Sequence, residues 1–406
     1  MKKLYSIITV FLLLGLLAGC GLFGDDENGE EVSTYLDGRY RGTYEDRGEQ
    51  QISIQFALED EIISNVSYRW LYHSGNDYRQ MDESHPLWGV KLQHDQIAEN
   101  LEGKHIGEIA SLHNPEDFAD DVDGFAAATI RGNKIYSAMR DALNRGLYTP
   151  AEEGYSVDLG DFLDGRYRGT YGDRGEQQVS IQFTLTNNEI SGVSFRWLYH
   201  SENDYRQMDD SHPLWPVKLQ HDQLAEYLEG KDISAIFDLH TPGVMADDID
   251  GFAAATLRGN KVYSAMRDAL NRGLYTPSEE GYSVDLGEFE DGRYRGIYGD
   301  RGEQQVSIQF TLTNNVISNV SYRWLYHSGN DYRQMDESHP LWGVKIQHDQ
   351  IAEYLEGKNI SVIFELHTPE LMADDVDGFA AATLRGNKIY SAMRDALNRG
   401  LYTPAS

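Results

Sequence analysis

The chain has 406 residues, an ordinary share of apolar residues (40%) and a formal net charge of -31. This length suffices for roughly two to four domains, and the strong acidity argues against nucleic acid or an anionic membrane surface as a partner, since both would repel it. The single cysteine, Cys20, excludes internal disulfides and cysteine metal clusters.

The first twenty residues, 1–20, have the pattern of a secretory signal. Two lysines precede a continuous apolar run, and small residues stand directly before Cys20. The run is too short for a spanning helix. Its LAGC ending, Leu17 to Cys20, resembles the bacterial lipobox, which implies cleavage before Cys20, lipidation of its thiol and anchoring on the extracytoplasmic face of a bacterial cell membrane. Residues 21–34 then read as an acidic, flexible tether.

An internal repeat sets the expected organisation of the rest. The motif DGRYRG begins at Asp37, Asp164 and Asp291, which are 127 residues apart. A period of this length is too long for a solenoid, so we expect three separate domains, 35–150, 162–277 and 289–406, arranged like beads on a string. Residues 149–162 and 276–290, opened by a proline and rich in acid, are the expected links.

Within a copy the periodicity changes halfway. Residues 39–44, 51–58 and 62–71 alternate in the manner of strands and predict an antiparallel meander. Residues 90–101 and 134–147 place apolar residues at helical spacing, and the second segment closes on an Asn-Arg-Gly helix stop. The fold class is therefore α+β, three tandem repeats of a small antiparallel sheet followed by helices. Pro216, where the other copies have glycine, predicts a loop position.

Four histidines recur in each copy, His73, His85, His94 and His113 in the first, but their spacing does not fit a metal site on one helix face. Structural histidines are the better interpretation, and no metal is expected. Ser74, His85 and Asp82 do not form a recognisable hydrolase triad, since no GxSxG elbow is present. Carboxylate pairs carry little information in so acidic a chain.

The aromatic segment Tyr68 to His73, with Trp88 further on, allows two interpretations. Aromatic residues on a strand are most often core or interface residues. They can also stack on a planar ligand, for which Trp70 and Tyr72 are the candidates.

The remaining motif, DGFAAAT, runs from Asp123 to Thr129 and recurs in the other copies. Arg131 and Lys134 follow it, where the last helix of the copy is expected to start. Free N–H groups and the positive end of the helix dipole, together with two cations, favour a phosphate group at this place. The alternative is an ordinary helix start, with aspartate as the cap and alanines chosen for helix propensity.

Together these segments resemble the FMN-binding domain family, which occurs in sodium-pumping NADH:quinone oxidoreductase, in Rnf complexes and in bacterial surface lipoproteins. The entry from Asp37 to Tyr68 looks like the opening strands of the family, and DGFAAAT looks like its flavinylation signature. In that family the final threonine of the signature carries FMN through a phosphoester, made by a separate flavin transferase that uses FAD and magnesium.

The resemblance assigns roles residue by residue. The implied FMN attachment points are Thr129, Thr256 and Thr383, with Asp123, Asp250 and Asp377 as part of the signature. The cations beside the phosphate would be Arg131, Lys134, Arg258, Lys261, Arg385 and Lys388. The chain departs from the signature in having alanine where the family has Ser or Thr (Ala126, Ala253, Ala380) and Gly (Ala127, Ala254, Ala381).

Two functions follow as expectations. The first is a membrane-anchored redox carrier with up to three covalent FMN groups, whose redox partners are unknown and which is not expected to turn over a substrate itself. The alternative is a surface binding or structural lipoprotein that retains the fold without the flavin.

Overall fold

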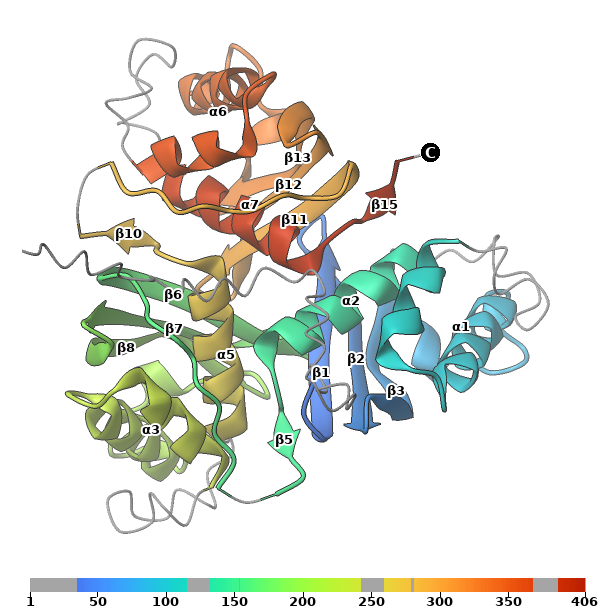
Figure 1. The fold of residues 1–406 in the computed structure, drawn as a ribbon, viewed down its shortest axis with the longest axis vertical. Coiled ribbons are helices and arrows are strands. Elements are labelled where there is room, and N and C mark those ends of the chain that lie inside the picture. Colours follow the sequence, from blue (N-terminus) through green and yellow to red (C-terminus); the bar gives the residue numbers. More distant parts are fainter. Residues whose placement is uncertain are drawn as a thin grey trace, which may run out of the picture.

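The computed structural model describes residues 35–114, 132–152, 154–241, 259–278, 281–367 and 386–405. Within them it confirms the α+β class: three similar five-stranded antiparallel sheets, each followed by helices (Figure 1). The elements of the first copy are β1 (Gly38–Asp46), β2 (Glu49–Glu59), β3 (Ile62–His73), β4 (Asn76–Asp77), the 3-10 helix η1 (Tyr78–Gln80), α1 (Trp88–Leu101), the 3-10 helix η2 (Ile106–His113), α2 (Gly132–Arg145) and β5 (Thr149–Pro150).

The other two copies repeat these elements. The second copy comprises β6 (Gly165–Asp173), β7 (Glu176–Thr186), β8 (Glu189–His200), β9 (Asn203–Asp204), η5 (Tyr205–Gln207), α3 (Trp215–Leu228), η6 (Ile233–His240), α5 (Gly259–Arg272) and β10 (Thr276–Pro277). The third comprises β11 (Gly292–Asp300), β12 (Glu303–Thr313), β13 (Val316–His327), β14 (Asn330–Asp331), η8 (Tyr332–Gln334), α6 (Trp342–Leu355), η9 (Ile360–His367), α7 (Gly386–Arg399) and β15 (Thr403–Pro404).

Each sheet is covered on one face by the last helix of its own copy. In the first copy the strand order is β4-β3-β2-β1-β5, and the inward residues Ile52, Ile54 and Phe56 are fully buried. Gly42 of β1 faces α2 so closely that a Cβ there would lie 2.2 Å from the carbonyl oxygen of Ala138. Only glycine permits this contact between strand and helix.

Two local expectations need correction. The segment expected as the first link begins with β5, which pairs Thr149 and Pro150 with β1 of its own copy. Pro216 is not in a loop but in the first turn of α3, where its missing N–H has no partner inside the helix in any case.

The expected beads on a string are wrong as well, because the copies close into a ring. The hairpin tip between β6 and β7 of the second copy lies on the outer face of the first sheet. There Arg69 donates three hydrogen bonds to the carboxylate of Asp173 (3.0, 3.1 and 2.8 Å), and a Cβ on Gly175 would lie 2.8 Å from Trp70. The same contact joins the second copy to the third and, through Arg323 and Asp46, the third back to the first.

The three last helices meet at the axis of this ring with their C-terminal ends, and their N-terminal ends lie at its periphery (Figure 1). Three asparagines join them in a closed cycle. Asn144 donates its side-chain N–H to the carbonyl of Asn398, Asn398 donates to Asn271, and Asn271 donates to Asn144. A cyclic pattern of this kind requires all three copies at once.

Beside the asparagines, three arginines and three aspartates alternate around the axis. Arg145 pairs with Asp141 of its own helix (2.8 Å) and approaches Asp268 of the next (3.6 Å). Arg272 and Arg399 repeat this, and Arg399 closes the cycle on Asp141 at 3.1 Å. All six side chains are at most 5% exposed. The carboxylates lie close enough together to hold a cation, but the guanidinium groups already balance their charge.

We predict that Gly169→Ala, the equivalent of Gly42 in the second copy, destabilises the protein strongly. Its Cβ would lie 2.1 Å from the backbone oxygen of Ala265, and overpacking of this kind costs about 1–3 kcal/mol or more. Chemical denaturation followed by circular dichroism measures the change. Gly89→Ala is the control, since a Cβ there meets nothing within 4 Å; equal unfolding midpoints for the two variants would contradict the close packing.

Candidate functional site

Most of the residues that the sequence assigns to the FMN site lie outside the described residues. These are Cys20, Asp123, Thr129, Arg131, Asp250, Thr256, Arg258, Asp377, Thr383 and Arg385. Their roles stay predictions. The described site residues are Lys134, Lys261 and Lys388, together with the elements on either side of each undescribed segment.

The helix expected after the motif is present, shifted by two residues. It was expected over 134–147 and spans Gly132–Arg145, so it begins three positions after Thr129. Its first N–H groups have no partner within the helix, and its dipole places partial positive charge at this end. The threonine therefore precedes a helix start that suits a phosphoester.

Lys134 lies in the first turn of this helix and points into the protein. Its side chain is 9% exposed, and its Nζ donates to Oε1 of Gln51 at 2.7 Å. The pKa of Lys134 is lowered to about 8, chiefly by burial and also by the positive charges of Arg295, Arg323 and Arg47, against the opposing effect of Asp46. The lysine thus lies where the first and third copies meet. We call each such contact, between the hairpin tip of one copy and the outer sheet face of its neighbour, a seam. Lys261 and Lys388 repeat this arrangement.

The four histidines of the copy have different surroundings. The Nδ1 of His94 lies 2.6 Å from the carbonyl of Val90 inside the core, and the Nδ1 of His85 accepts from the N–H of Leu87 at 3.1 Å. Within the described part of the chain, neither His73 Nδ1 nor either ring nitrogen of His113 has a hydrogen-bond partner.

His113, which precedes the undescribed segment, contacts α2, which follows it. The His113 ring lies 4.1 Å from the ring of Tyr136, and burial lowers the pKa of this histidine to about 4. In the second copy the ring of Tyr155, a residue of the link, also packs edge-on against Phe237 and lies near His240. The third copy has the same contact between Tyr282 and Phe364. The first copy has Ala110 at the position of the phenylalanine.

The aromatic candidates for flavin stacking belong to the seam instead. Trp70 stacks on Tyr72 at 5.5 Å, donates its Nε1–H to the carbonyl of Gln50 at 3.1 Å and packs against Gly175 of the next copy. This position fits the interface interpretation of the segment. The residues considered for a triad also bond elsewhere, since Asp82 accepts from Ser84 and His85 from Leu87.

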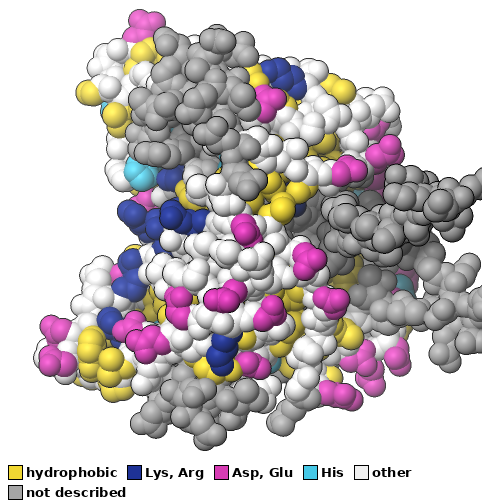
Figure 2. Space-filling view, turned by 60° about the vertical axis from the view of Figure 1, so that its left-hand side comes forward, with side chains coloured by type: hydrophobic (Ala, Val, Ile, Leu, Met, Phe, Trp, Pro, Cys, Tyr) yellow, Lys and Arg dark blue, Asp and Glu magenta, His cyan; other side chains and the backbone are white. Residues whose placement is uncertain are grey.

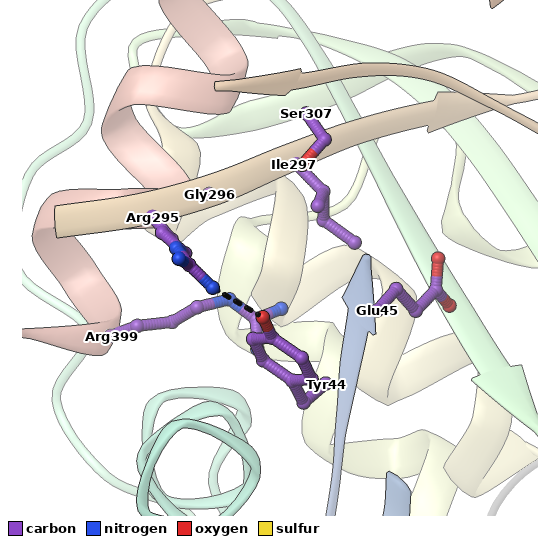
Figure 3. Close-up of a pocket in the computed structure, with 7 residues that line it drawn as sticks. All are labelled: Tyr44, Glu45, Arg295, Gly296, Ile297, Ser307 and Arg399. Atoms are coloured by element: carbon purple, nitrogen blue, oxygen red, sulfur yellow. Dashed lines mark hydrogen bonds between the residues drawn. The ribbon is translucent and has the colours of Figure 1, made fainter. Parts of the chain in front are cut away.

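One residue breaks the threefold repetition near the axis. Glu45 stands where the other copies have Gly172 and Gly299. Glu45 is one of the residues that line a small hollow between the first and third copies, where Arg295 donates to the hydroxyl of Tyr44 at 3.4 Å (Figure 3). Sequence reasoning missed this glutamate, although alignment of the three copies reveals the difference.

Glu45 is an acid whose proton is held tightly. Its pKa is raised to about 7, chiefly by desolvation and also by the charges of Asp141 and Asp395. Together these effects outweigh the opposing charges of Arg399 and Arg145. The axis therefore has four carboxylates for three guanidinium groups, and a proton on Glu45 balances the excess.

No protein-family model, curated protein or solved structure matches the chain. The resemblance to the FMN-binding domain family therefore stays a prediction from the motifs. Among the described residues, no helix is long and apolar enough to cross a membrane.

We predict that Glu45→Gln removes the part of the pH dependence of the free energy of unfolding that comes from titration of Glu45. The folded protein binds this proton more tightly than the unfolded chain, so the free energy of unfolding falls as the pH rises from 4.5 to about 7 and then levels off. The variant should match the original near pH 4.5 and exceed it by about 1–3 kcal/mol at pH 8.

Denaturant titrations at a series of pH values measure this difference. Glu59→Gln, an exposed carboxylate at the end of β2, is the control and should leave the profile unchanged. Parallel profiles for Glu45→Gln and the original protein would show that the proton is not held at the axis.

Proposed function

We propose that the protein is a lipid-anchored extracytoplasmic carrier of up to three covalently bound FMN groups that serve in electron transfer. The observation that carries this proposal is the position of three equivalent helix starts, each three residues after the threonine of a DGFAAAT-type motif. When bound, FMN supplies one- and two-electron chemistry.

The described residues fit a phosphoester at this position through the backbone. The first N–H groups of α2, α5 and α7 have no partner inside their own helices and lie at the positive end of a helix dipole. The lysine of the first turn contributes charge from inside the protein, since its Nζ is bonded to a glutamine of β2, β7 or β12. Direct contact of that lysine with phosphate is not required.

The ring keeps the three proposed sites apart. Each helix has 14 residues, which makes it about 20 Å long, and the C-terminal ends are the ones that meet at the axis (Figure 1). Three flavins at the outer ends would each exchange electrons with external partners rather than in sequence along the chain. This arrangement favours a carrier with parallel sites.

The second candidate is a surface binding or structural lipoprotein without flavin. Two observations favour it: Lys134 is already bonded to Gln51, and Trp70 is packed in the seam. The alanines at 126 and 127 point the same way, because they replace two residues of the signature.

Intact mass spectrometry of the mature protein, coexpressed with a flavin transferase, separates the two candidates. We expect up to three FMN adducts, yellow colour and in-gel fluorescence. An unmodified mass under these conditions would refute the carrier and leave the binding or structural role.

Thr256→Ala should remove one adduct and leave the other two, because the three sites are far apart. Thr276→Ala, an exposed threonine of β10 outside the motif, should keep all three. Loss of one adduct in both variants would show that attachment does not occur at the threonine of the motif.

A further inference from the structure

Each seam of the ring gathers more cations than carboxylates. Where the third copy meets the first, the charged neighbours of Lys134 are Asp46 and three arginines. The neighbouring His73 has Glu49 as a further charged neighbour. The cations of this cluster are Lys134, Arg47, Arg295 and Arg323, and its carboxylates are Asp46 and Glu49. A local excess of positive charge therefore exists in a chain of net charge -31.

The excess is visible at the surface. Figure 2 shows Lys and Arg side chains gathered beside a histidine, between the upper body and the lower one, on a face that is otherwise dotted with Asp and Glu. These two bodies are the third and second copies of Figure 1. The equivalent cations of that seam are Lys388, Arg301, Arg168 and Arg196.

Internal pairing accounts for only part of this charge. The carboxylate of Asp46 forms an ion pair with Arg323, which donates two hydrogen bonds to it at 2.8 and 2.6 Å. Arg295 lies over the ring of Tyr402 at 3.8 Å and reaches the same carboxylate, that of Asp46, at 4.0 Å. Lys134 has a neutral partner, the amide oxygen of Gln51. The positive charge of the lysine is thus buried without a carboxylate at hydrogen-bond distance among the described residues.

Arg47 is the exposed member of the cluster. It lies at the tip of the β1–β2 hairpin with a φ of 53°, a conformation that Asn, Asp or Gly adopts at lower cost. Within the described residues it has no ion-pair partner. Arg174 and Arg301 have the same conformation, with φ of 51° and 53°, and the same lack of a partner in the described part of the chain.

His73 completes the site from the end of β3. Its Nδ1 is buried and has no hydrogen-bond partner among the described residues, as also holds for His200 and His327. Desolvation and the charges of Lys134 and Arg47 lower its pKa, so the ring is neutral at pH 7. A neutral imidazole can still donate one N–H to an oxygen ligand.

We propose that each seam binds a phosphate-class oxyanion between the guanidinium of Arg47 and the imidazole of His73, or their equivalents in the other copies. The buried charge of Lys134 adds to the attraction while its Nζ stays bonded to Gln51. Such an ion would compensate the buried lysine and make charge-assisted hydrogen bonds. It would also lie beside Arg323 of the neighbouring copy, so its binding stabilises the closed ring. The proposal does not depend on flavin attachment.

The test uses the full, unflavinylated chain and two probes, inorganic phosphate and glycerol phosphate. Isothermal titration calorimetry at fixed ionic strength in chloride should show two equivalent sites and a weaker third in the second copy, where Glu202 adds a carboxylate in place of glycine. Thermal unfolding should shift upward with phosphate but not with added chloride. Binding of inorganic phosphate alone assigns a free ion, whereas equal binding of both probes assigns a phosphoryl group carried on a larger molecule. No heat and no shift with either probe would overturn the proposal.

Variants locate the site. Replacing Arg47, Arg174 and Arg301 together by Gln should weaken phosphate binding about tenfold or more, and these exposed turn residues can be changed without disturbing the core. The matched control replaces Arg39, Arg166 and Arg293 by Gln, since these are exposed arginines at the far ends of the same strands. Equal weakening in both variants would show a general charge effect and refute the seam site.

Discussion

The alternating ring of three arginines and three aspartates at the axis determines the arrangement of everything else. Each aspartate accepts a hydrogen bond from an arginine of its own helix and another from a backbone N–H of the first strand of its own copy. In the first copy the N–H of Thr43 donates to Asp141 at 2.8 Å, and the other copies repeat this bond. Each arginine also donates to a strand carbonyl of the next copy. Because these charges are buried, loss of one partner leaves the other uncompensated, at a cost of about 3–5 kcal/mol. The ring of charges thus makes the three copies depend on one another.

This constraint also places the proposed functional regions. The C-terminal ends of the helices are fixed at the axis, where the arginines offset the negative ends of the helix dipoles. The N-terminal ends are therefore directed to the periphery, one for each copy. Each seam in turn brings the hairpin tip of one copy against the outer face of another sheet, which creates a cationic cluster that a single copy would not contain.

Much of the fold of one copy could be predicted from the sequence, because strand alternation, helical spacing and the helix stop at Gly146 are local signals. The helix boundaries differed from the expectation by two residues, which reflects the fraying of helix ends. The ring could not be predicted in this way, since Arg69, Asp173 and Trp70 look like ordinary strand residues until their partners are known. The lysine after the motif was expected beside a phosphate, but it is buried against Gln51, the residue that the register shift opposite Tyr44 and Glu45 leaves unpaired. The sequence pattern does not reveal this shift.

Cleavage of both links in the folded protein tests the closed ring most directly. Protease sites inserted within 154–161 and 281–288 would cut the chain between its copies, and size-exclusion chromatography with light scattering would then measure the mass under native conditions. The ring predicts that the three fragments stay together with the mass of the uncut chain and separate only in denaturant. Release of single copies without denaturant would contradict the ring and restore the picture of independent domains.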